Sequence, residues 1–151
     1  MRIMPQPKPL THNGNTMKKL LLLSLAAILL AGCADKNQYE QAVLEQMKLD
    51  KDIADYKAAP ERMAKCVVDS SSKNMPGAFG LDPTRMMAYR NYTKMLTLSS
   101  SKDPKKTLDE LAVEFGSPKE LAEAHTNYTE SLMECMSASI SESENEAKEQ
   151  K

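Results

Sequence analysis

The stretch DPKKTLDELAVEFGSPKELAEAHTNYTESLMECM, residues 103–136, decides the fold class. It contains two dipeptides, Asp103-Pro104 and Ser117-Pro118, that place a side-chain acceptor just before a proline. Such a pair begins a helix, because the acceptor caps the first turn and proline lacks an N–H that the first helical position would leave unpaired. Apolar residues then recur at helical spacing, and Gly116 suits the left-handed cap that ends the first helix. The stretch therefore predicts two consecutive helices.

Similar signals predict helices over most of the remaining chain, from about residue 39 to residue 140. Asp82-Pro83 repeats the capping dipeptide, and Pro60 starts or kinks a helix of its own. The pattern lacks the alternation and hairpin turns of strands. We therefore expect an all-α domain over residues 39–140, a small bundle of four to five helices. The expected helices cover residues 39–58, 61–70, 83–98, 104–115 and 118–140.

Two further segments are expected to lie outside helices. The Ser-, Gly- and Pro-rich stretch 70–83 is the one long loop between the helices. The end of the chain, residues 141–151, is charged and has little apolar surface to bury, so we expect it to be disordered.

Length and charge restrict the class of protein. At 151 residues the chain is long enough for one domain. From Cys33 onward it holds sixteen basic and twenty-one acidic residues, a net charge of −5. This balance argues against nucleic-acid binding, because phosphate contacts need a concentrated basic face.

The first third of the chain has the pattern of a targeting segment. Lys18 and Lys19 precede an apolar run, residues 20–31, which is too short to span a bilayer and is typical of a secretory signal peptide. The polar, proline-containing residues 1–16 do not belong to such a signal. We expect residues 17–32 to be the signal peptide and residues 1–16 to be an extended or mis-assigned leader, with translation starting at Met17.

The signal ends in Leu30-Ala31-Gly32-Cys33, which resembles the lipobox of bacterial lipoproteins. The resemblance implies that the bond between Gly32 and Cys33 is cleaved. It also implies that Cys33 receives a diacylglyceryl group on its thiol and an N-acyl chain on the new amino terminus, two or three chains that together anchor a protein stably. Residues 33–38 would then be a lipidated tether.

The same resemblance implies a place in the cell envelope, facing the periplasm. Asp at the position after the cysteine retains such lipoproteins in the inner membrane. Ala34 stands there in this chain, which favours the outer membrane, although Asp35 follows one place later.

Cys66 and Cys135 remain once Cys33 is assigned to the lipid. Both lie in apolar helical stripes, and an exported compartment is oxidising, so we expect them to face each other in the core and form a disulfide. A redox-active pair is less favoured because there is no C-x-x-C motif. A further alternative is Cu(I) binding by Cys135 together with His125, Met133 and Met136, because soft ligands select this ion.

The sequence offers no motif of an enzyme. His125 is the only histidine after the signal peptide, and nucleophile, metalloprotease and phosphate-loop motifs are missing. The acidic pairs Glu110/Glu114 and Glu120/Glu123 have the spacing of solvated helix faces. We therefore expect no enzyme, no catalytic residue, no metal, no small-molecule substrate and no cofactor other than the covalent lipid.

Binding of a protein partner is the remaining expectation. Met75, Phe79 and Leu81 lie in the predicted loop, where exposed apolar residues would suit a partner. The favoured alternative is that Phe79 and Leu81 simply pin the loop onto the helices. We expect an adaptor that is anchored in the membrane lipid and binds an envelope protein. The alternative is an inhibitor or immunity-type lipoprotein that neutralises a toxin or a cell-wall enzyme through an acidic face or an inserted loop.

Overall fold

A computed structural model describes residues 34–56 and 58–149. All regular secondary structure in these residues is helical, and they contain no strand, which confirms the predicted all-α class. The expected leader, the signal peptide and Cys33 lie outside the described residues, as do Lys57 and the last two residues of the chain.

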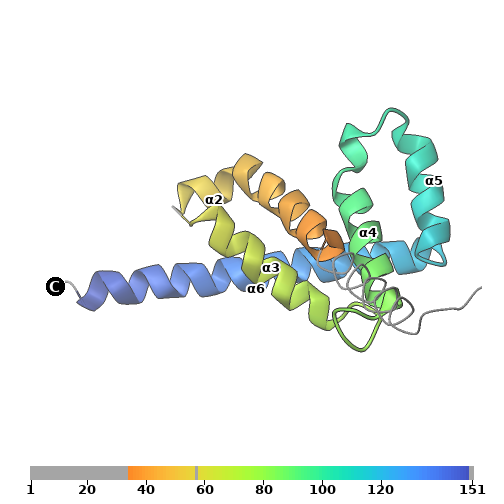
Figure 1. Cartoon of the computed structure of the whole chain (residues 1–151). Coiled ribbons are helices and arrows are strands. Elements are labelled where there is room, and N and C mark those ends of the chain that lie inside the picture. The colour runs from red at the N-terminus through yellow and green to blue at the C-terminus, as the bar shows by residue number, and fades with distance from the viewer. Residues whose placement is uncertain (1–33, 57, 150–151) are drawn as a thin grey trace, which may run out of the picture. The chain divides into compact units, whose positions relative to one another are not determined.

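The longest helix, α6, is the base on which other helices pack (Figure 1). Contacts join α3 and α5 to α6, and α4 lies beside α5. The helices, in chain order, are an N-terminal stretch 34–49, α2 (Lys51–Asp55), α3 (Pro60–Lys73), α4 (Pro83–Leu96), the short 3-10 turn η1 (Leu98–Ser100), α5 (Pro104–Glu114) and α6 (Pro118–Glu149).

The three capping dipeptides begin helices as predicted. The Asp82 carboxylate accepts from the Thr84 N–H at 2.9 Å, and that of Asp103 accepts from the Lys106 N–H at 3.0 Å. The Ser117 hydroxyl accepts from the Glu120 N–H at 3.2 Å. Gly116 has φ +103°, so it supplies the left-handed residue that ends α5.

The first expected helix, 39–58, is instead two helices. Asp50 has extended backbone angles, and its carboxylate accepts from the Asp52 N–H at 2.9 Å. This side chain therefore caps α2 and interrupts the helix that precedes it.

Helical structure also extends beyond both ends of the expected domain. The expected tether is helical from residue 34, because Asp35 is buried and pairs with Arg90 at 2.9 Å, while Lys36 pairs with Asp69 at 3.2 Å. The expected disordered tail continues α6 to Glu149. Extending an existing helix avoids the cost of a new nucleus, and this segment is rich in good helix formers.

The core is built around tyrosines as well as aliphatic residues. The rings of Tyr39 and Tyr89 stack at 5.9 Å between centroids, and Tyr39 meets the edge of Tyr92 at 5.6 Å. All three side chains are buried. The Tyr39 hydroxyl lies 2.9 Å from the Ser71 hydroxyl, which donates to the Val67 carbonyl. The N-terminal helix is thereby fixed to α3 and α4.

A disulfide between Cys66 and Cys135 joins α3 to α6, as predicted. The Cα atoms are 5.9 Å apart. Cys135 is 2% exposed, whereas Cys66 lies on the exposed side of α3, so the expectation that both side chains point into the core holds for Cys135 alone.

Candidate functional site: an acidic groove between α4, α5 and α6

An open groove with a cavity volume of about 550 Å³ lies between α4, the end of α5 and the first half of α6. We call it the acidic groove. Its apolar lining includes Met87, Ala88, Phe115 and Ala124. Its lining also holds four carboxylates, those of Glu114, Glu120, Glu123 and Glu130. None of the described residues that line the groove is a lysine or an arginine.

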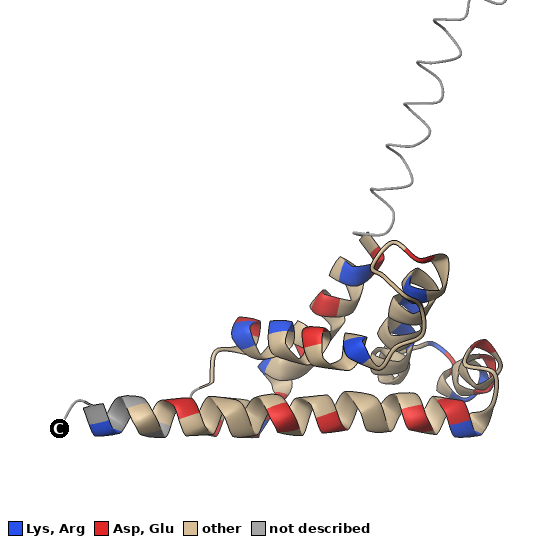
Figure 2. Cartoon of the chain, turned by 90° about the horizontal axis from the view of Figure 1, so that it is seen from below, with Lys and Arg blue, Asp and Glu red and all other residues tan. Residues whose placement is uncertain are grey.

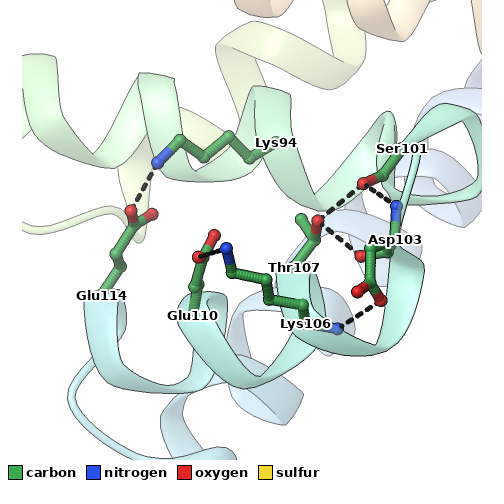
Figure 3. A network of polar contacts seen from close by, with 7 residues as sticks. All are labelled: Lys94, Ser101, Asp103, Lys106, Thr107, Glu110 and Glu114. Carbon is green, nitrogen blue, oxygen red and sulfur yellow. Dashed lines mark hydrogen bonds and ion pairs between the residues drawn. The ribbon is translucent and has the colours of Figure 1, made fainter.

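Polar contacts at both ends of α5 hold this wall of the groove in place, and Figure 3 shows those between Lys94 and Glu114 and between Ser101 and Thr107. The Lys94 ammonium on α4 pairs with the Glu114 carboxylate at the end of α5, and the Asn91 amide donates to the Glu114 carbonyl at 3.3 Å. At the other end of α5, the Ser101 and Thr107 hydroxyls are 2.6 Å apart. Both ends of α5 are therefore fixed.

The side chain of Asn127 on α6 connects neighbouring segments of the chain at the groove. Its amide donates to the Tyr92 hydroxyl at 2.9 Å and to the Ser71 carbonyl at 3.0 Å, and its oxygen accepts from the Asn74 amide at 3.0 Å. The Tyr92 ring meets Phe115 edge to face at 5.7 Å. One amide thus connects α3, α4 and α6, which makes the groove a preformed feature of the fold.

The negative charge of the groove follows from the composition of α6. This helix carries eight glutamates and two lysines, and Figure 2 shows acidic bands along it with basic residues only near its two ends. Lys119 pairs with Glu123 at 3.0 Å, and hydrogen bonding to Glu123 raises the pKa of this lysine. The Ser117 hydroxyl donates to the Glu120 carboxylate at 3.1 Å. Neither Glu120 nor Glu130 makes an ion pair with a described residue.

The three loop residues that the sequence suggested as partner contacts differ in their exposure to solvent. Met75 is 4% exposed and belongs to the core, so it is not a surface contact. Phe79 is 64% exposed and Leu81 is 41% exposed. These two side chains are accessible, as a partner contact requires.

The loop that carries Phe79 is well anchored. The Arg85 guanidinium donates to the Ser72 carbonyl and, at 2.6 Å, to the Gly77 carbonyl. The Asp82 carboxylate accepts from the Ala78 N–H at 2.9 Å, and this hydrogen bond, followed by that from Thr84, holds the pKa of the carboxyl below its ordinary value. Phe79 is therefore presented by a fixed backbone.

A second groove, of about 640 Å³, lies between the end of α4, η1, α5 and the start of α6. Its lining is mainly aliphatic, and Leu108 is 46% exposed there. Charge offers little basis for selecting an occupant, because Asp109 and His125 are the only titratable residues in its described lining.

The residues of the copper alternative do not form a free ligand set. Cys135 is in the disulfide, so it has no thiolate to offer. His125 and Met133 are exposed, and Met136 packs against the core. The described residues contain no group of three or more His, Cys, Asp or Glu placed to hold a metal ion.

Three of the groove carboxylates, Glu114, Glu120 and Glu123, were predicted only as solvated surface groups. Met87 and Glu130 carried no signal that separates them from other exposed helix residues. Their significance depends on residues of α4 and α6 lining the same groove, which spacing along one helix does not reveal.

None of the helices in the described residues combines the length and the apolar character needed to cross a membrane. No protein family, curated protein or solved structure matches the chain.

Proposed function

We propose that the protein is a lipid-anchored lipoprotein of the cell envelope that acts as a non-enzymatic adaptor. Its lipid would be carried by Cys33, and its domain would hold a protein partner at the periplasmic side of the membrane, with the outer membrane favoured. The lipobox resemblance at residues 30–33 is the observation that carries the anchor. The exposed Met87 in the acidic groove and the exposed Phe79 and Leu81 of the loop before α4 support the adaptor role.

The beginning of the folded domain supports a short connection to the membrane. Ion pairs from Asp35 and Lys36 hold the N-terminal helix to Arg90 on α4 and Asp69 on α3. Residue 34, directly after the proposed lipidated cysteine, is already helical. A lipid on Cys33 would therefore hold the domain close to the headgroups, and a partner would have to lie at the membrane surface.

The anchor is tested by labelling cells with an alkyne fatty acid. We expect the wild-type protein to carry the label and to migrate as the cleaved form. Cys33→Ser should carry no label and should accumulate as the longer precursor. Cys66→Ser, which keeps the lipobox intact, is the matched control and should be labelled. Normal cleavage of the Cys33→Ser protein would show that the lipobox assignment is wrong.

The adaptor role is tested by crosslinking in intact envelopes. We expect the lipidated protein to enrich one resident envelope protein, and we expect the Cys33→Ser form to lose that enrichment because its domain is no longer held at the membrane. A protein that enriches no resident partner, although it is lipidated and folded, contradicts the adaptor role.

The acidic groove favours one alternative, an inhibitor or immunity-type lipoprotein directed at a basic toxin or cell-wall enzyme. Carboxylates on a preformed surface can block a basic active-site rim. This function predicts protection of cells against a foreign enzyme and an envelope capture without a resident partner, so the crosslinking experiment separates it from the adaptor.

A further inference from the structure

Building on the proposed function, we propose that the acidic groove binds a lysine- or arginine-rich amphipathic helix of the partner protein. The four carboxylates in the lining, and the absence of basic residues from its described part, determine the sign of the charge that the occupant must carry. Glu120 and Glu130 lack an ion pair within the described part of the chain. The pairs of Glu114 and Glu123 lie at the surface, where a second cation can compete with Lys94 and Lys119.

The occupant must also bring apolar side chains. Met87 is 55% exposed and lines the groove, and the half-buried Phe115 and the small Ala88 and Ala124 lie with it. Removing this surface from water favours an apolar partner, whereas the carboxylates favour a basic one. A segment with one apolar face and a basic border satisfies both requirements.

A helix is the form of such a segment that this surface accepts. The described residues contain no strand, so they offer no sheet edge to which an extended peptide could add. A groove between helices instead accepts apolar residues spaced three and four apart on one helical face. The hydrogen bonds of Asn127 and Asn91 hold the groove walls before binding, which lowers the cost of ordering on association.

The test uses two synthetic fluorescent peptides of leucine and lysine or leucine and glutamate, with leucines in the same helical register. The purified full-length protein is kept in a detergent with neutral headgroups. We expect the lysine peptide to bind, the glutamate peptide not to bind, and the affinity for the lysine peptide to fall as salt is added. Fluorescence anisotropy gives the dissociation constants.

Variants locate the binding. Glu123→Gln/Glu130→Gln should weaken lysine-peptide binding by about 3- to 10-fold, because two partly exposed ion pairs are lost. Met87→Ser should weaken it by about 10-fold through lost apolar burial. The control Glu45→Gln/Glu110→Gln removes the same charge from exposed sites outside the groove and should leave binding unchanged. Circular dichroism checks that every variant is folded.

Three results would overturn the inference. The lysine peptide could fail to bind at low salt, or the glutamate peptide could bind as tightly as the lysine peptide. The third result is that the groove variants and the control variant lose equal amounts of affinity for the lysine peptide. The last result would mean attraction by overall charge alone.

Failure of this inference is distinguishable from failure of the adaptor role. A photocrosslinker at Met87 reports contact in the groove, whereas one at Leu49, which is 77% exposed, lies outside it. Capture of a resident partner from position 49 but not from position 87 would support the adaptor role and contradict binding in the acidic groove. If the lysine peptide binds as expected but the Cys33→Ser protein is cleaved normally, binding in the acidic groove is supported and the lipid anchor is contradicted.

Discussion

At the scale of single residues, buried hydroxyl groups connect the helices and make the fold sensitive to high pH. Burial raises the pKa of Tyr39, although its hydrogen bond to Ser71 acts in the opposite direction. Burial and, to a smaller extent, the Asp50 carboxylate raise the pKa of Tyr128 to about 12. An unfolded tyrosine loses its proton near pH ~10. Between pH ~10 and the folded-state pKa of Tyr128, this tyrosine loses its proton in the unfolded chain but keeps it in the folded protein.

Stability should therefore fall as the pH rises from about 10 toward 12, and Tyr128→Phe should reduce this loss. Because the pKa of each buried tyrosine is higher in the folded protein than in the unfolded chain, its protonated hydroxyl contributes fully to the free energy of unfolding below pH ~10. That contribution is lost as the pH rises through the folded-state pKa. Urea unfolding at pH 8 and pH 11 measures the difference. Tyr56→Phe is the control, since that ring is 57% exposed. An identical loss in wild type and Tyr128→Phe would contradict the role of Tyr128.

At the scale of elements, the loop between α3 and α4 depends on one glycine. Gly77 has φ +98°, and a Cβ added there would lie 2.7 Å from the backbone nitrogen of Arg85. Arg85 is also the residue whose guanidinium holds this loop. Gly80 differs, because a Cβ at that position would meet nothing within 4 Å.

Gly77→Ala should destabilise the protein by about 1–3 kcal/mol, because a left-handed backbone and a close backbone contact both oppose the added methyl group. Gly80→Ala in the same loop should change the free energy of unfolding by less than about 0.5 kcal/mol. Urea denaturation measures both values. Equal effects of the two substitutions would show that the loop tolerates a side chain at Gly77 and is less fixed than its hydrogen bonds indicate.

The helices that the sequence predicted well are those with local start signals. Asp82, Asp103 and Ser117 each precede a proline, and each caps its helix. The break at Asp50 was missed because no proline or glycine marks it, and only its side-chain hydrogen bond reveals the cap. The helical start at residue 34 was missed because its ion-pair partners, Arg90 and Asp69, are distant in sequence.

At the scale of the whole molecule, the arrangement of helices creates the candidate site. Met87 and Glu123 belong to different helices, and the sequence contains no pattern that brings them to one groove. The disulfide was predicted from two cysteines in apolar helical stripes, together with the expectation that the chain is exported to an oxidising compartment. It joins α3 to α6, and α6 also supplies one wall of the groove.

Loss of this bond should lower the thermal midpoint of unfolding by more than about 10 °C. The bond closes a loop with a sequence separation of 69 residues, for which the chain-entropy model gives about 4 kcal/mol. One kcal/mol corresponds to roughly 4–8 °C in a small domain. Thermal unfolding of Cys66→Ala/Cys135→Ala, followed by circular dichroism, measures the shift without a reductant. Wild-type protein heated with a thiol reductant should give a similar midpoint, and a drop of less than about 3 °C in both experiments would contradict a major stabilising role.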